Sequence, residues 1–395
     1  MLTRKELYDV YARIKPFIHR TPLTYSNAFS NMAAAEVYIK AENLQKTGAY
    51  KVRGVFNKIA GLGSDRVVTA SMGNHAQAVA YAAKILGMQA KIIMPITVSI
   101  IKEQATRSYG ADVILHGDGL QAAIEYAMAQ EGYAFIHPFD DDEIIAGQST
   151  VGLEIVEDMQ NIDTILAPVG GGGLIAGIAL AVKKLSPGTE IIGVQTEAAQ
   201  SAYRSFHGNK IIAFDPQPTI ADGIAVGRVG EKTFPIIKEL VDDMVLVNEE
   251  EIAVAVLLFM ERKKLIVEGA GAVPLAAFLA NKDRFKGKWV VLVASGGNMD
   301  LTMIDRIVRK GLVTSGRINV FEVVVDDVPG SLHELTGIIA GHRVNILHVD
   351  HDRFAEDLPL GKTRLSLTVE TRAREDLRDA IAGIRAGGFI VLGAH

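Results

Sequence analysis

Between residues 66 and 148, short apolar runs alternate with longer segments whose apolar residues recur at helical spacing. Runs of this kind are typical of buried strands, and apolar positions three or four residues apart are typical of helices that face a sheet. Their alternation predicts βαβ units with a parallel sheet. The predicted strands are RVVTA (66–70), AKIIMP (90–95), ADVILHG (111–117) and YAFIHPF (133–139), and the predicted helices are 74–87, 99–110 and 120–132.

A second series of the same kind follows. DTILAPV (163–169) leads through four glycines into the helical pattern LIAGIALAVKKL (174–185), and EIIGVQTE (190–197) predicts the next strand. Later, WVVLVA (289–294) leads into SGGN. We therefore expect an α/β fold with two lobes, in which a smaller lobe of about residues 53–148 is inserted into a larger one.

The pattern changes near residue 317. The tail predicts the order strand, helix, strand, strand, helix, strand, which is the split ferredoxin-like βαββαβ unit. The segments are 319–327, 329–342, 343–354, 363–371, 374–388 and 389–394. We expect a main domain over 1–310, a linker over 311–317 and a second domain over 318–395.

Composition and charge narrow the class of protein. The chain has 395 residues, 49% hydrophobic and 22% charged, with a formal net charge of -5. This balance allows large packed cores and provides no basic field for nucleic acid or an anionic membrane. The absence of cysteine excludes disulfides, thiolate nucleophiles and cysteine-bound zinc. The N-terminus has no apolar signal core and no segment matches a membrane span, so we expect a cytoplasmic protein.

The four consecutive glycines are the first candidate site. Gly170, Gly171, Gly172 and Gly173 join a predicted strand to a predicted helix. Free amides at a helix N-terminus attract an anion, and glycine lets the backbone approach it closely, which favours a phosphate cradle. Gly171, Gly173 and Ala176 also fit the dinucleotide pattern G-x-G-x-x-A, with Glu197 near the ribose position. A nicotinamide enzyme therefore remains an alternative at this point.

A second strand-to-helix turn, SMGNHAQ (71–77), predicts a second anion site. Ser71 and Asn74 are good helix-capping residues, so capping alone would explain them. Alternatively, the amides of this turn bind a carboxylate with the help of the Ser71 and Asn74 side chains. Two anion sites on two lobes would suit a phosphorylated cofactor and a carboxylate substrate.

Lys51, in TGAYKVRG, gains meaning from these two sites, although most lysines are simply solvated surface charges. Pyridoxal phosphate needs a lysine for its aldehyde, a phosphate cradle, a partner for its pyridine nitrogen and a wall for its ring. Lys51, the glycine loop, Ser295 and Tyr50 can supply these four. We expect burial and the neighbouring Arg53 to favour the neutral, nucleophilic amine of Lys51.

The order of motifs carries a family resemblance. They are ENLQKTGAYKVRG (42–54), SMGNHAQ (71–77), PVGGGGLIAG (168–177), TIADGIAV (219–226) and VASGGN (293–298). With them the chain resembles the threonine/serine dehydratases, which belong to the tryptophan-synthase-β-like, fold type II class of pyridoxal phosphate enzymes. The tail, with DDVPGSLHEL (326–335), is similar to an ACT regulatory domain.

The resemblance implies roles for particular residues. Lys51 takes the position of the lysine that binds the cofactor and removes the Cα proton, Asn74 that of the ring-hydroxyl contact, and Ser295 that of the pyridine-nitrogen contact. The phosphate would lie on Gly170, Gly171, Gly172, Gly173 and the amide of Leu174, with Tyr50 beside the ring. The substrate carboxylate would lie on Ser71, Met72, Gly73, Asn74 and His75.

Departures from the family pattern bear on the reaction. Ala49 and Tyr50 stand where the family often has Ser-Phe. Met72 stands where related serine racemases have a proton-transferring serine, which argues against racemisation. Tyr203 stands where the second acid of a cation site would follow Glu197, so we predict no metal.

The resemblance implies deamination of L-threonine to 2-oxobutyrate and ammonia, with L-serine as a secondary substrate. The alternatives are a serine racemase or β-replacement enzyme of the same fold, a nicotinamide oxidoreductase, and a non-catalytic amino-acid sensor. The ACT-like tail implies allosteric regulation by an amino acid and a homodimer or homotetramer. An effector such as isoleucine would suit isoleucine biosynthesis, and a different signal would suit degradation.

For three further side chains, the sequence allows both a functional and a structural role. His137 and Asp140 either line the cleft or form a strand-end turn. Glu268, in IVEGAGAVP, is either a carboxylate near the cofactor or a structural, paired one, and the structural role is favoured.

Overall fold

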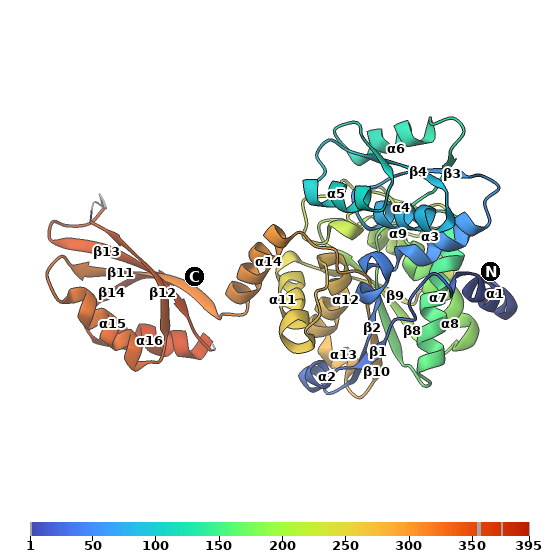
Figure 1. Cartoon of the computed structure of the whole chain (residues 1–395). Coiled ribbons are helices and arrows are strands. Elements are labelled where there is room, and N and C mark those ends of the chain that lie inside the picture. The colour runs from blue at the N-terminus through green and yellow to red at the C-terminus, as the bar shows by residue number, and fades with distance from the viewer. Residues whose placement is uncertain (1, 354–356, 373, 395) are drawn as a thin grey trace. The chain divides into compact units, whose positions relative to one another are not determined.

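A computed structural model describes residues 2–353, 357–372 and 374–394 (Figure 1). The chain divides into two compact units, residues 1–304 and residues 305–395. The first unit contains two α/β lobes and the second an antiparallel sheet with two helices, each described below in its own frame.

The larger lobe is built on a six-stranded sheet of order β1-β2-β10-β7-β8-β9. All neighbouring strands pair in parallel except β1, which is antiparallel to β2. Helices α7 and α8 lie on one side of this sheet and α11 and α12 on the other (Figure 1). The strands are Leu23–Tyr25 (β1), Glu36–Ala41 (β2), Thr164–Pro168 (β7), Glu190–Thr196 (β8), Asp243–Val247 (β9) and Trp289–Ala294 (β10).

The following helices belong to this lobe, and α3 also joins the core of the smaller lobe. They are Arg4–Ile14 (α1), Asn27–Ala33 (α2), Lys51–Ala60 (α3), Asp142–Asp158 (α7), Gly173–Leu185 (α8), Ser201–Gly208 (α9), Thr233–Leu240 (α10), Glu249–Leu258 (α11), Gly269–Ala280 (α12) and Lys282–Phe285 (α13). Short helical turns lie at Glu42–Leu44 (η1), Lys46–Gly48 (η2), Asp222–Ile224 (η3) and Phe259–Lys263 (η4).

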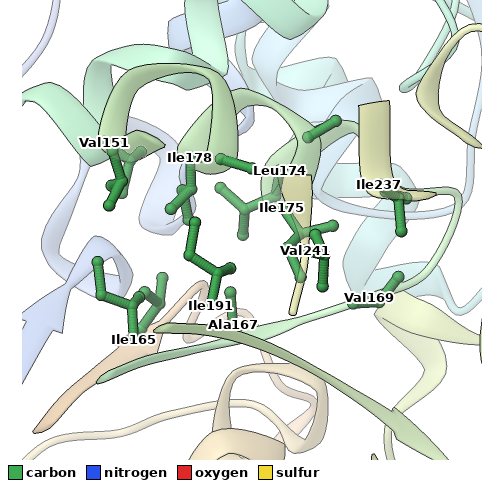
Figure 2. Packing of buried hydrophobic residues seen from close by; sticks show 14 of the residues in the cluster. Val151, Ile165, Ala167, Val169, Leu174, Ile175, Ile178, Ile191, Ile237 and Val241 are labelled. Atoms are coloured by element: carbon green, nitrogen blue, oxygen red, sulfur yellow. The ribbon is translucent and has the colours of Figure 1, made fainter. Parts of the chain in front are cut away.

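The core between α8 and the sheet explains why these segments are so apolar. Figure 2 shows Ile175 and Ile178 of α8 pointing toward the strands. Ile165 and Ile191, on β7 and β8, complete this layer, and all four side chains are fully buried. A strand that is covered on both faces has no polar side, which is why the pattern of β7 and β8 is a continuous apolar run.

The smaller lobe holds a parallel sheet of order β5-β4-β3-β6. Its elements are Arg66–Ala70 (β3), Asn74–Leu86 (α4), Gln89–Met94 (β4), Ile100–Ser108 (α5), Asp112–Leu115 (β5), Leu120–Met128 (α6) and Ala134–Phe135 (β6). The α/β alternation predicted from the sequence is confirmed. Strand β6 is much shorter than the predicted segment 133–139, because Pro138 has no N–H and the His137 Nδ1 accepts the next two amides, of Phe139 and Asp140.

The second unit has the predicted βαββαβ order. Its sheet order is β12-β13-β11-β14, all antiparallel, and α15 and α16 pack on its apolar core. The elements are Ile318–Asp326 (β11), Ser331–Gly341 (α15), Asn345–Asp352 (β12), Lys362–Glu370 (β13), Arg374–Ala386 (α16) and Ile390–Ala394 (β14).

The segment 311–317 differs from the expected linker. Helix α14, Leu301–Thr314, runs through most of it. The single glycine in this segment, Gly311, costs a helix only about 1 kcal/mol, and Ile304, Ile307 and Leu312 recur at helical spacing. Among the described residues, no helix is long and apolar enough to cross a membrane.

Candidate active site

One pocket of the first unit collects every residue that the sequence analysis assigned to cofactor or substrate. It lies where carboxyl ends of parallel strands from both lobes meet strand-to-helix turns, the usual place for a site in α/β folds. These lining residues are Tyr50, Lys51, Ser71, Met72, Gly73, Asn74, His75, Gly170, Gly171, Gly172, Gly173, Leu174 and Ser295. Their individual roles remain predictions that the geometry below supports to different degrees.

Lys51 is the first residue of α3, and its amine faces the pocket. Its Nζ donates a hydrogen bond of 2.8 Å to the Pro138 carbonyl and lies 5.3 Å from the centre of the Tyr50 ring. Burial lowers the pKa of Lys51 to about 8, although the Glu268 carboxylate partly opposes this shift. Near pH 8, about half of this amine is therefore neutral and nucleophilic.

Arg53 does not act on Lys51, so the expectation that it favours the neutral amine is wrong. Its guanidinium points away from the pocket into a fully buried cluster with Lys40, Glu42 and Glu154, here called the buried ion cluster. Two carboxylates surround it with hydrogen bonds of 2.8 Å. Residues two positions apart on a helix do not share a face, which explains why Lys51 and Arg53 diverge.

The buried ion cluster holds α3 in place. Glu42 comes from η1, Lys40 from β2 and Glu154 from α7, and all four ionic side chains are completely buried. The Lys40 Nζ lies 2.6 Å from Glu154 Oε2 and 2.7 Å from the Thr21 carbonyl. The two positive and two negative charges balance, so α3 and the Lys51 that it carries are fixed to the larger lobe.

The glycine loop forms a cradle free of side chains. The first helical hydrogen bond of α8 runs from the Ala176 amide to the Gly172 carbonyl, so the amides before Ala176 have no partner within the helix. Gly172 has a φ of +98°, which disfavours a side chain. A Cβ on Gly171 would lie 2.4 Å from the ring of Phe139. These amides line the pocket and have no partner within the helix, so they fit a phosphate group.

Helix α10 fixes the direction of this loop. The Gly230 amide and the Thr233 hydroxyl both donate to the Gly171 carbonyl, at 3.1 and 2.7 Å. Asp140 in turn accepts the amides of Glu231, Lys232 and Thr233 at the start of α10. Asp140 therefore has a structural contact at the start of a helix, and His137 forms the strand-end turn described above.

The loop SMGNHAQ is not a helix cap. The residue before α4 is Gly73, and no side chain accepts the first amides of the helix. The Ser71 hydroxyl lies 3.3 Å from the Gly73 amide, while the Asn74 side chain turns to other partners. Capping alone therefore fails as an explanation, and the first amides of α4 are left to bind an anion such as a carboxylate.

His75 can contribute only its backbone to such an anion site. Its Nε2 lies 3.0 Å from the Ile136 carbonyl oxygen, which can only accept, so Nε2 carries the hydrogen. Burial lowers the pKa of His75 to about 3, so the imidazole stays neutral. A carboxylate would gain no positive charge from this side chain.

Ser295 is buried where two chain segments pair. Its carbonyl accepts the Tyr50 amide at 3.1 Å, and Ala49 forms an antiparallel bridge with Gly296. The pairing brings Ser295 directly beside the segment that carries Lys51. A neutral hydroxyl at this position is compatible with the predicted pyridine-nitrogen contact.

Glu268 and Asn298 both line the pocket. The sequence analysis favoured a structural role for Glu268 and assigned no role to Asn298. The Asn74 Nδ2 donates to Glu268 Oε1 at 2.8 Å, and the Asn74 Oδ1 accepts from the Asn298 Nδ2 at 2.9 Å. Burial raises the pKa of Glu268 to about 7, with the Asp222 carboxylate adding to the shift. Partners 194 and 224 residues apart leave no local signal in the sequence.

A second missed pair spans the two lobes. Lys102 of α5 and Asp222 of η3 line the pocket and form an ion pair of 2.6 Å. Asp222 stands inside TIADGIAV, a motif that was recognised without a role for this residue. Within the described ranges, no group of three or more histidine, aspartate or glutamate side chains is arranged to hold a metal ion.

The raised pKa of Glu268 predicts an unusual pH dependence. The folded protein keeps this proton up to about pH 7, whereas the unfolded chain loses it near 4.5, so wild-type stability falls as pH rises between these values. A glutamine in its place would not titrate. In the cofactor-free protein, we expect the melting temperature of Glu268→Gln relative to wild type to rise from about pH 5 to pH 8. Parallel pH profiles would contradict the assignment.

Comparisons with known proteins agree with this geometry. The family model "Pyridoxal-phosphate dependent enzyme" matches residues 14–296. The chain is 46% identical over 398 aligned residues to an L-threonine ammonia-lyase of Thermotoga maritima, covering 99% of each chain. Among solved structures, threonine deaminase isoform 2 of Solanum lycopersicum has a TM-score of 0.75 at 37% identity, covering 78% of this chain and 88% of that one. A maize serine racemase has a TM-score of 0.73 at 35% identity, covering 79% and 98%.

Proposed function

The chain belongs to the family of pyridoxal-phosphate dependent enzymes, and we propose that it is an L-threonine ammonia-lyase. It would convert L-threonine to 2-oxobutyrate and ammonia, with L-serine as a secondary substrate. The observation that carries the proposal is the partly neutral Lys51 in one pocket with two separate sets of free helix-terminal amides. Membership of the family removes the nicotinamide oxidoreductase from the alternatives.

The residues present fit the cofactor. The glycine loop with the amide of Leu174 would hold its phosphate, Lys51 its aldehyde, and Asn74 and Ser295 the polar atoms of its ring, with Tyr50 beside the ring. When bound, pyridoxal phosphate supplies an aldehyde that captures the substrate amine and a ring that accepts electrons released at Cα. The amides at the start of α8 support this placement, because they have no partner within the helix.

Different groups of the pocket would take different roles in the reaction. The amides at the start of α4 would hold the substrate carboxylate, and the neutral Lys51 amine would remove the Cα proton and keep it on Nζ. Met72, which lines the pocket, has no exchangeable proton. This favours loss of the β-hydroxyl over return of a proton to the opposite face, and so favours elimination over racemisation.

The direct test is product analysis of the cofactor-loaded protein. We expect L-threonine to give 2-oxobutyrate and ammonia in equal amounts, and L-serine to give pyruvate more slowly. Chiral chromatography of the remaining serine tests the racemase alternative, which the maize neighbour keeps relevant. Accumulation of D-serine without keto acid would replace the proposed reaction, while a protein that takes up no pyridoxal phosphate would overturn the site as a whole.

For the second unit we propose an ACT-like regulatory role. Its βαββαβ order and the similarity to the Thermotoga maritima protein along nearly the whole chain support this proposal. The predicted ligand is an amino-acid effector, and the predicted assembly is a homodimer or homotetramer in the cytoplasm. Titration calorimetry with isoleucine and valine, and light scattering of the purified protein, test these two points.

A further inference from the structure

Asn298 connects two parts of the pocket that come from distant segments. Its Nδ2 donates to the Thr47 carbonyl at 2.6 Å and to the Asn74 Oδ1 at 2.9 Å. Thr47 lies just before Lys51 in the chain, and Asn74 begins α4 of the smaller lobe. One carboxamide thus holds the lysine segment and the anion-binding turn together.

The chemistry of the partners fixes the direction of this chain of hydrogen bonds. The Thr47 carbonyl can only accept, so the NH2 group of Asn298 must face it. The second hydrogen of that group then requires an oxygen on Asn74, which turns the Asn74 Nδ2 toward Glu268. Without Asn298, only the Glu268 carboxyl group would orient the Asn74 amide, and a protonated carboxyl group can donate to the Asn74 oxygen as well as accept from its NH2 group.

The backbone around Asn298 is arranged to admit its side chain. Gly48 has a φ of +72°, and a Cβ on Gly48 would lie 2.5 Å from the Asn298 Oδ1. Its carbonyl accepts the Gly297 amide at 2.9 Å, next to the bridge between Ala49 and Gly296. A glycine in the left-handed region is therefore required both by the turn and by the asparagine that fills the space beside it.

We propose that Asn298 is a positioning residue that orients the Asn74 carboxamide, so that the Asn74 NH2 group faces Glu268 and the cofactor ring. The inference rests on the proposed function, because it gives Asn74 its predicted contact with the ring hydroxyl. Asn298 acts through Asn74 and need not touch the cofactor itself.

The test is Asn298→Asp, which keeps the shape and removes both donors. The aspartate oxygen that replaces Nδ2 would face both the Thr47 carbonyl and the Asn74 Oδ1, so the Asn74 amide should rotate. We expect the affinity of the cofactor-free protein for pyridoxal phosphate to fall about tenfold or more, and the absorbance maximum of the bound cofactor to shift. Asn74→Ala should produce the same shift, and the double variant should add little to either single change.

Asn43→Asp is the matched control. Asn43 is buried and also donates to a backbone carbonyl, of Ile266 at 3.0 Å, but no hydrogen bond connects it to Asn74. It should lower the melting temperature without moving the spectrum. If Asn298→Asp does not fold, Gly48→Ala provides the second approach, because its new Cβ displaces the Asn298 side chain and should reproduce the spectral shift.

The outcomes separate this inference from the proposed function. Unchanged affinity and spectrum in Asn298→Asp or Gly48→Ala, or effects that add fully to those of Asn74→Ala, would overturn the positioning role alone. A wild-type protein that binds no pyridoxal phosphate would overturn the proposed function, and this inference with it.

Discussion

Replacement of Lys51 by alanine should lower turnover of L-threonine at least about 10³-fold. The half-buried Lys51 amine lines the same pocket as the glycine loop, and desolvation lowers its pKa to about 8. Alanine removes both the nucleophile for the cofactor aldehyde and the base for the Cα proton. No other side chain of the pocket offers a comparable amine, since Lys102 is paired with Asp222, which raises its pKa.

Two measurements check this expectation. The first is the steady-state rate of 2-oxobutyrate release, and the second is the visible absorbance of the protein after loading with pyridoxal phosphate. Lys58→Ala is the control, because Lys58 lies on the same helix and its Nζ pairs with Asp141 at 2.7 Å. A Lys51→Ala protein that retained both the rate and the absorbance of wild type would disprove the assignment of Lys51.

The largest expected effect on stability comes from Glu154→Gln. Glu154 is fully buried, with the Lys40 Nζ at 2.6 Å and the Arg53 Nη1 at 2.8 Å. Glutamine keeps the shape but leaves two buried positive charges with the buried Glu42 carboxylate and the partly exposed Asp158, whose Oδ2 lies 3.9 Å from the Lys40 Nζ. Removal of one partner from a buried ion pair costs about 3–5 kcal/mol, so we expect a loss of that size in the free energy of unfolding of the first unit.

Urea denaturation, followed by the fluorescence of Trp289 in the first unit, measures this change. Glu103→Gln is the control, because its pair with Arg107 is exposed and should contribute about 0.3–0.5 kcal/mol. A loss below about 1 kcal/mol for Glu154→Gln would show that the cluster adapts to the missing charge.

The buried Glu154 carboxylate also predicts how stability depends on pH. The two cations hold the pKa of Glu154 below its ordinary value of 4.5, so its contribution is complete above that pH and is lost as pH falls through the lower, folded pKa. The difference between wild type and Glu154→Gln should therefore shrink in acid. A difference that stayed constant down to acid unfolding would argue against a charged Glu154.

Much of the fold follows from local pattern. Alternating apolar runs and helical segments predicted both α/β lobes, since strands such as β7 and β8 must be apolar on both faces when helices cover them. The βαββαβ order of the tail was predicted in the same way and is confirmed. Glycines between a strand and a helix predicted a phosphate cradle, and the structure leaves the amides there without a helical partner.

The sequence alone determined which turns could bind anions and which lysine lay among the motifs of the family, because turn chemistry and motif order are written in adjacent residues. Only the tertiary structure decided where the polar side chains point. Arg53 belongs to a buried ion cluster instead of assisting Lys51, and Asn74 orients toward Glu268 and Asn298 instead of capping its helix. These partners lie as much as 224 residues apart, and hydrogen bonds between them form only when the two lobes are folded together.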